Sequence, residues 1–178
     1  SITGEPVTVL RNDAFAIEDL QMFDKIILSP GPGIPNEAGL LMQVLATYGN
    51  SKPILGVCLG HQAIGEHFGA TLTNLTDVYH GVATTCNIIG ENNNNTWQPQ
   101  SVLFKNLTPQ IEVGRYHSWV INSNTVPNEL AITATDDNGY IMATQHTTLP
   151  VFGVQFHPES VLTPKGNQIN NNWLQATV

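Results

Sequence analysis

The chain has 178 residues, a length that fits one domain spanning residues 1–178, and 6 Lys and Arg against 14 Asp and Glu give a formal net charge of −8. That balance, without any basic run, argues against nucleic-acid binding, because phosphate contacts need clustered positive charge. No apolar stretch approaches the ~20 residues that span a bilayer, no signal peptide is recognisable, and two cysteines are too few for a disulfide framework, so we expect a cytoplasmic protein without membrane contact.

Short apolar runs bounded by Gly, Pro and Asn are typical of strands buried in a sheet. They predict strands at Val7–Leu10, Lys25–Leu28, Ile54–Val57 and Val151–Gln155. Helical spacing of apolar residues predicts helices over Glu37–Tyr48, before the stop at Gly49, and over His61–Phe68. Strands that alternate with helices favour parallel pairing through crossover helices.

The second half of the chain has a different pattern, with short strands separated by turn signals such as Asp137-Asn-Gly139. Strands are predicted at Val82–Ile89, Glu112–Tyr116, Trp119–Ile121, Ala131–Thr135 and Tyr140–Gln145. Asn92–Asn95 has no apolar periodicity and is interpreted as an exposed loop, while Gly166–Leu174 is interpreted as a terminal helix. The expected fold class is therefore α/β, with a mostly parallel central sheet, flanking helices and an antiparallel extension.

The segment Gly56-Val-Cys58-Leu-Gly60 lies between a predicted strand and a predicted helix. This is the cysteine version of a nucleophile elbow, a sharp turn that lifts the reactive side chain above the sheet. Side chains at Gly56 or Gly60 would crowd such a turn. At the start of a helix, Cys58 would gain thiolate stabilisation, and the N–H of Leu59 would face a developing oxyanion. The alternative is that Cys58 is a small core residue, which is how we interpret Cys86.

A cysteine nucleophile needs a base, and the base needs an orienting partner. His157 follows a predicted strand and opens His157-Pro-Glu159, so Glu159 can reach one imidazole nitrogen while the other faces Cys58. Without the cysteine elbow, the same segment would be interpreted as a surface turn. The other histidines suit the role less well, because His61 is expected to point away from the sulfur and His67 to pack on its helix. His80 and His146 have no carboxylate nearby in the sequence.

The loop Ser29-Pro-Gly31-Pro-Gly33 follows the strand predicted at Lys25–Leu28. Alternating Pro and Gly makes a stiff loop whose N–H groups can point in unusual directions. It lacks the Gly-Lys-Ser/Thr ending and the G-x-G-x-x-G pattern of phosphate-binding loops. A second oxyanion donor fits the cysteine chemistry better than a phosphate cradle, and a rigid turn without function is the remaining alternative.

Four segments occur in the order found in the class I glutamine amidotransferases, and together they resemble that family over about Asp24 to Leu174. They are Ser29-Pro-Gly-Pro-Gly33, Gly56-Val-Cys-Leu-Gly-His-Gln62, Gly114-Arg-Tyr-His-Ser118 and Gln155-Phe-His-Pro-Glu-Ser160. The resemblance implies a flavodoxin-like α/β fold and an enzyme that hydrolyses glutamine. It also implies that no metal and no organic cofactor takes part in this half-reaction.

By that resemblance, Cys58 is the nucleophile, His157 the base and then acid, and Glu159 the residue that orients His157. The resemblance assigns the oxyanion hole to the N–H groups of Gly31 and Leu59. Substrate-binding residues carried over from the family are Gly31, Pro32, Gly33, Gln62, Ser118 and Trp119.

The third motif and the ending Ser160-Val-Leu-Thr-Pro-Lys-Gly166 look most like the glutaminase subunit of anthranilate synthase, with that of aminodeoxychorismate synthase nearly as similar. The implied partners are L-glutamine and a large chorismate-binding synthase subunit that receives the ammonia. Two other interpretations are a gamma-glutamyl peptidase and a non-catalytic regulatory module of the same fold. Relatives usually begin with a strand and helix that are not found ahead of Ser1, and they often place Lys or another polar residue where Val82 follows His80-Gly.

Overall fold

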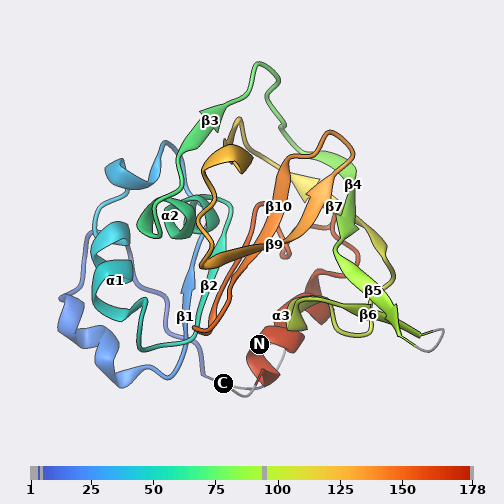
Figure 1. Ribbon diagram of the computed structural model, residues 1–178. Coiled ribbons are helices and arrows are strands. Elements are labelled where there is room, and N and C mark those ends of the chain that lie inside the picture. The colour runs from blue at the N-terminus through green and yellow to red at the C-terminus, as the bar shows by residue number, and fades with distance from the viewer. Residues whose placement is uncertain (1–3, 5, 94–95, 177–178) are drawn as a thin grey trace.

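The computed structural model describes Gly4, residues 6–93 and residues 96–176 (Figure 1). The first part of the chain contains short strands, helices and 3₁₀ turns in alternation. Its elements are η1 (Ile17–Met22), β1 (Ile26–Leu28), η2 (Pro35–Glu37), α1 (Leu41–Tyr48), β2 (Ile54–Val57), α2 (Leu59–His67) and β3 (Leu72–Asn74). Among the described residues, no helix is long and apolar enough to cross a membrane.

The second part consists mainly of strands and ends in a helix. Its elements are β4 (Val82–Ile88), β5 (Gly90–Asn93), β6 (Thr96–Pro99), η3 (Val102–Phe104), β7 (Gln110–Arg115), β8 (Trp119–Ile121), η4 (Ser123–Thr125), β9 (Leu130–Asp136), β10 (Ile141–His146), β11 (Val151–Val154) and α3 (Gly166–Gln175). The terminal helix expected at Gly166–Leu174 is confirmed, and its Ile169 and Trp173 are buried in the core.

The main sheet has seven strands in the order β1-β2-β11-β10-β9-β4-β7. β1, β2 and β11 pair in parallel, whereas β11 through β7 pair in antiparallel fashion. The expected α/β class, with parallel strands and an antiparallel extension in one sheet, is confirmed. β11 is last in sequence but lies next to β2, with Val154 opposite Val57, so the two strands end at the same edge.

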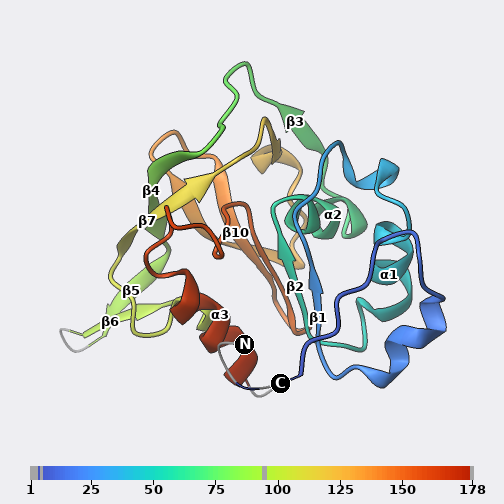
Figure 2. The same cartoon turned by 180° about the vertical axis from the view of Figure 1, so that it is seen from behind.

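Helices cover both faces of the parallel strands, with α1 and α2 on one side and α3 on the other (Figures 1 and 2). Side chains of successive strand residues point to opposite faces, which places β2 in two cores at once. Ile54 packs in the cluster that contains α1 and α2, and Leu55 packs in the cluster that contains α3. Because both faces are buried, β2 consists of apolar residues and glycine rather than alternating polar and apolar ones.

Some predicted elements were wrong. Val7–Leu10 is not a strand, and Val7 and Val9 are 75% and 89% exposed, since no strand in the described part of the chain pairs with this apolar run. α1 begins at Leu41 instead of Glu37, because the positive φ of Gly39 (59°) interrupts the backbone before the helix. α2 begins directly after Cys58, two residues earlier than expected.

The antiparallel part also differs from the expectation in two places. β8 matches its predicted bounds but pairs with β3 in a separate two-stranded sheet, so it does not extend the main sheet. Asn92 and Asn93, expected in a loop, belong to β5 and pair with β6, while Asn94 and Asn95 lie outside the described residues. Residues 91–93 are exposed, so this hairpin shows none of the apolar alternation that reveals a half-buried strand.

Candidate active site

Cys58 sits at a strained turn between β2 and α2. Its φ of 52° and ψ of −100° are unusual for a residue with a side chain, and its N–H donates to the carbonyl oxygen of Val154 (2.8 Å). A Cβ on Gly56 would collide with the carbonyl of Gly60, and one on Gly60 would collide with the carbonyl of Leu28. The two glycines therefore allow the close approach of strand and helix that the elbow requires.

His157 is brought to the same edge of the sheet, because it follows the end of β11 next to β2. Its N–H donates to the carbonyl of Gly114 (3.0 Å), and its own carbonyl accepts from the hydroxyl of Thr163 (2.7 Å). Its Nδ1 lies 2.7 Å from Oε1 of Glu159. Since an ionised carboxylate can only accept, Nδ1 carries the proton and Nε2 is left for Cys58.

The surroundings of His157 favour its protonated form. Burial lowers the pKa of His157, but hydrogen bonds and negative charge from Cys58 and Glu159 outweigh it and raise the pKa to about 9. Nε2 of His157 is buried and has no well-aligned hydrogen bond among the described residues, so it is free to exchange a proton. Burial raises the pKa of Glu159, but the hydrogen bond with His157 reverses this and keeps the pKa lowered.

The structure brings Gly31 and Leu59 together beside the elbow. A Cβ on Gly31 would lie 2.9 Å from Cδ2 of Leu59, so the loop lies close to the first residue of α2. Leu59 is the first residue of α2, and its N–H therefore has no partner within the helix. The free N–H of Leu59, directly after the thiol of Cys58, is a donor of the kind that an oxyanion needs.

The predicted substrate-binding residues fall into two groups. Gln62 and Trp119 are in direct contact, since Nε2 of Gln62 donates to the carbonyl of Trp119 (2.8 Å), and Ser118 directly precedes Trp119. Pro32 and Gly33 are exposed in the loop that contains Gly31, and no contact with Cys58 is recorded for either of them. Gln62 therefore connects α2 to the segment that the resemblance assigns to substrate binding.

Two residues near the reacting groups were missed in the sequence. Gln155 is fully buried, and its Nε2 donates to Sγ of Cys58 (3.6 Å). Tyr116 packs its ring against His157, with centroids 4.8 Å apart, and its hydroxyl lies 3.1 Å from Oγ of Ser160. Both residues lie inside the motifs that carry the family resemblance, and this position was the sequence feature that could have pointed to them. Nothing in the linear sequence showed which atoms they would meet.

Three of the rival histidines pack or hydrogen-bond elsewhere, and His80 is exposed. His61 is fully buried with Nδ1 3.4 Å from Oγ1 of Thr144, and burial lowers the pKa of His61 to about 3, so it stays neutral. His146 uses Nδ1 to accept the backbone N–H of Leu149 (2.9 Å). His67 packs edge-on against Phe68, with centroids 4.8 Å apart, as expected for a helix-packing residue.

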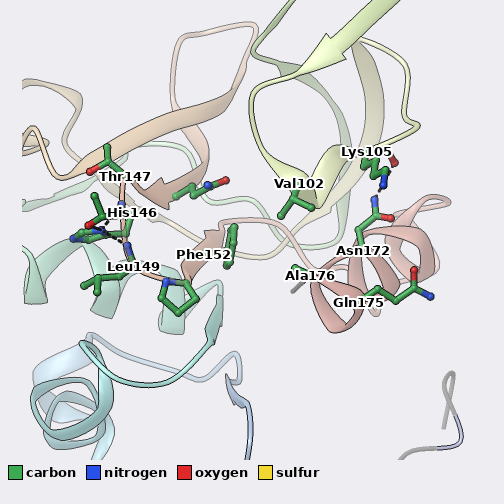
Figure 3. A pocket seen from close by; sticks show the side chains of 12 residues that line it. Val102, Lys105, His146, Thr147, Leu149, Phe152, Asn172, Gln175 and Ala176 are labelled. Carbon is green, nitrogen blue, oxygen red and sulfur yellow. Dashed lines mark hydrogen bonds between the residues drawn. The ribbon is translucent and has the colours of Figure 1, made fainter. Parts of the chain in front are cut away.

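A cavity of about 370 Å³ lies between the start of β11 and α3, away from the elbow (Figure 3). Phe152, His146, Lys105 and Asn172 are among its lining residues, which include neither cysteine nor carboxylate. Its position at the beginning of β11 separates it from His157, which follows the end of that strand. In the described part of the chain, no cluster of three or more His, Cys, Asp or Glu side chains could hold a metal ion.

Known proteins are similar to this chain in sequence and in fold. Residues 3–176 match the family model described as glutamine amidotransferase class-I. The anthranilate synthase component 2 of Mycobacterium tuberculosis (strain H37Rv) is 40% identical over 176 residues, which cover 96% of this chain and 72% of that protein. The aminodeoxychorismate synthase component 2 of Escherichia coli (strain K12) is 38% identical over 173 residues, covering 96% of this chain and 87% of the other.

Among solved structures, a Thermoplasma acidophilum protein provisionally described as one of the subunits of GMP synthase superposes with a TM-score of 0.77. It is 26% identical in sequence, and the alignment covers 92% of this chain and 76% of that one. The family model spans nearly the whole chain, and the cysteine elbow, the histidine and the glutamate occupy one edge of its sheet. The chain belongs to the class I glutamine amidotransferase family.

Proposed function

We propose that this chain hydrolyses L-glutamine to glutamate and ammonia, acting as a single glutaminase domain. The observation that carries the proposal is the meeting of Cys58 at a strained elbow with the hydrogen-bonded pair His157–Glu159 at one edge of the sheet. Family membership and a raised pKa at His157, which favours a thiolate–imidazolium pair, support the same chemistry.

The reaction proceeds in two acyl-transfer steps. The thiolate of Cys58 attacks the carboxamide carbon of glutamine, and the N–H groups of Gly31 and Leu59 stabilise the oxyanion. His157 gives its proton to the departing nitrogen, which leaves as ammonia, and a thioester remains on Cys58. His157 then takes a proton from water, the hydroxide displaces the sulfur, and glutamate is released. Glu159 keeps the imidazole in the orientation that both proton transfers need.

Substrate is held by the loop and strand segments around the elbow. We assign this role to Gly31, Pro32, Gly33, Gln62, Ser118 and Trp119. The hydrogen bond from Gln62 to Trp119 supports the assignment for one side of the site, because it holds residues 118–119 beside α2. The exposed loop at residues 31–33 is open to an incoming ligand on the other side.

The proposed destination of the ammonia is a large chorismate-binding synthase subunit that makes anthranilate for tryptophan biosynthesis. This choice is supported by the relatives named anthranilate synthase component 2 and by the segment Ser160–Gly166. Relatives named aminodeoxychorismate synthase component 2 support the second candidate, a partner in folate biosynthesis. We place both candidate complexes in the cytoplasm, where a reducing environment keeps Cys58 as a thiol.

Ammonia release from glutamine tests the catalytic assignment. Cys58→Ala is expected to lower the rate at least about a thousandfold, because the covalent step is lost. Cys86→Ala provides the matched control, since Cys86 is a second buried cysteine and is expected to retain most activity. Equal loss in both variants, with both still folded, would contradict Cys58 as the nucleophile.

The pathway is tested by product identification. The chain is mixed with candidate synthase subunits, glutamine and chorismate, and the aromatic product is identified by mass and fluorescence. Anthranilate supports the first candidate, and aminodeoxychorismate supports the second. If neither synthase forms a glutamine-dependent product with this chain, the proposed partnership is contradicted.

A further inference from the structure

The side chain of Gln155 is buried and contacts the sulfur of Cys58. Gln155 directly follows β11, is fully buried, and donates from Nε2 to Sγ at 3.6 Å. Its backbone N–H donates to the carbonyl of Met142 (2.8 Å), so the residue is fixed on the neighbouring strand β10. A buried amide held in this way has a fixed position relative to the sulfur.

The direction of this amide follows from its neighbour. Nε2 of Gln62 donates both to the carbonyl of Trp119 (2.8 Å) and to Oε1 of Gln155 (3.3 Å). Since the oxygen of Gln155 accepts from Gln62, its nitrogen must face Cys58, and both N–H groups point away from Gln62. The hydrogen-bond pattern thus selects the donor end of Gln155 for the sulfur.

The pattern continues into the antiparallel extension and is fixed there by a permanent charge. Nε of Arg115 donates to Nε2 of His117 (3.1 Å), which leaves Nδ1 of His117 to donate to the carbonyl of Trp119 (3.0 Å). Burial and the charge of Arg115 lower the pKa of His117 to about 3, so the imidazole stays neutral in this tautomer. The carbonyl of Trp119, which can only accept, receives both Nδ1 of His117 and Nε2 of Gln62, and this fixes the amide nitrogen of Gln62 as the donor.

We infer that Gln155 is a positioning residue for the nucleophile, holding the sulfur of Cys58 by an N–H donor and stabilising its thiolate form. The inference rests on the proposed function, in which Cys58 attacks glutamine. A hydrogen bond to an ionised acceptor is stronger than one to a neutral acceptor, so the contact favours thiolate over thiol. It also opposes rotation of Sγ away from His157.

The surrounding charges define what else can influence this sulfur. The titratable groups that lie near Cys58 or connect to it through hydrogen bonds are His157, Glu159, His117, Arg115, Asp136 and, on α2, the neutral His61. A substitution at Gln155 changes none of these charges. A shift in the ionisation of Cys58 in such a variant therefore reports on the amide donor.

The test measures the rate at which iodoacetamide alkylates Cys58 between pH 4 and pH 10, with modification assigned by peptide mass spectrometry. Gln155→Met removes the donor and keeps a side chain of similar length. The midpoint of the pH–rate curve is expected to move upward by about one unit, so that alkylation at neutral pH slows roughly tenfold. Gln145→Met on β10 is the matched control, a glutamine whose buried Oε1 has no partner among the described residues, and it should leave the midpoint unchanged.

The melting temperature of Gln155→Met shows whether this variant folds. If it does not, a second variant tests the inference. Gln62→Met leaves Gln155 in place but removes the group that orients its amide, and a smaller upward shift is expected. An unchanged midpoint in folded Gln155→Met overturns the inference. If Gln155→Met does not fold, an unchanged midpoint in folded Gln62→Met overturns it. Alkylation needs no glutamine turnover, so this result is independent of the ammonia-release test that decides the proposed function.

Discussion

The two cysteines show how differently the parallel and antiparallel parts of the sheet use the same side chain. Cys58 and Cys86 are both buried, 5% and 0% exposed. Cys58 follows the end of β2, where the chain turns and the thiol leaves the ladder of the sheet. Cys86 lies within β4 and is paired on both sides, with Ile111 on β7 and Asp136 on β9. A side chain at the end of a strand can meet groups from other segments, whereas a side chain inside a strand is enclosed by the neighbouring strands.

The electrostatic surroundings follow the same division. Burial, together with the charge of Asp136, raises the pKa of Cys86 to about 12, and nearby Arg115 offsets only part of this. Cys58 instead meets the imidazole of His157, whose pKa is raised to about 9 by the sulfur and Glu159 against the effect of burial. The surroundings of the two thiols thus differ because of their positions in the sheet, since the residue type and the degree of burial are nearly the same.

The antiparallel part contains an enclosed ion pair that serves the fold. Arg115 and Asp136 are 2.6 Å apart with side chains 1% and 2% exposed, and Oδ1 of Asp136 also accepts the backbone N–H of Tyr140 (2.8 Å). Arg115 additionally lies 3.5 Å from the ring centre of Tyr79. Glu159, the charged partner of His157, has a 57% exposed side chain and can respond to solvent and substrate.

The largest effect is expected from breaking the enclosed pair. Arg115→Met leaves Asp136 buried without its partner and should lower the free energy of unfolding by about 3–5 kcal/mol. For a chain of this size that corresponds to a melting temperature roughly 10 °C lower, measured by calorimetry. Arg11→Met is the control, because the pair Arg11–Asp13 is largely exposed and its loss should leave stability unchanged. Equal stability of both variants would contradict a stabilising role for the enclosed pair.

A smaller effect is expected at the elbow. Gly60→Ala places a methyl group against the carbonyl of Leu28 and should cost about 1–3 kcal/mol in unfolding free energy while displacing Cys58 and lowering glutaminase activity. Gly139→Ala in the β9–β10 turn meets open space, and only its φ of 81° opposes the change, at about 1 kcal/mol. Full activity is expected in Gly139→Ala, and unaltered activity in Gly60→Ala would contradict the close-packed elbow.

The smallest effect is a shift in titration. NMR of the imidazole resonances should show His157 titrating at a pKa of about 9, and Cys58→Ala should lower that pKa because it removes the neighbouring sulfur. Since the pKa lies above its ordinary value of 6.5, protonation of His157 stabilises the fold fully below about pH 6.5. This stabilisation is lost as the pH rises through about 9. A wild-type pKa near 6.5 would mean that Cys58 and Glu159 do not act on His157.

Local sequence patterns predicted most of the elements near the site, because each of those elements buries both faces. β2 and β11 consist of apolar residues and glycine, and the segments around Cys58 and His157 follow them directly. The same reasoning failed for Val7–Leu10, which has the composition of a strand but no neighbouring strand to pair with. It also failed for the exposed hairpin of β5 and β6, whose pairing is independent of apolar periodicity.

The sequence by itself determined the reactive residue types and their immediate backbone. Gly56, Cys58 and Gly60 define a turn over a few residues, and His157 and Glu159 are close enough along the chain to form their hydrogen bond locally. Short-range sterics and hydrogen bonding act between neighbours in sequence and can therefore be inferred from them.

Only the tertiary structure decided which distant groups meet. The pairing of β11 with β2 brings Gln155 to the sulfur of Cys58, and the separate pairing of β8 with β3 accompanies the contact of Trp119 with Gln62. Such contacts depend on strand order and register, which arise from the packing of the whole core. No local pattern specifies them, since the free energy that selects one register is spread over many residues far apart in the chain.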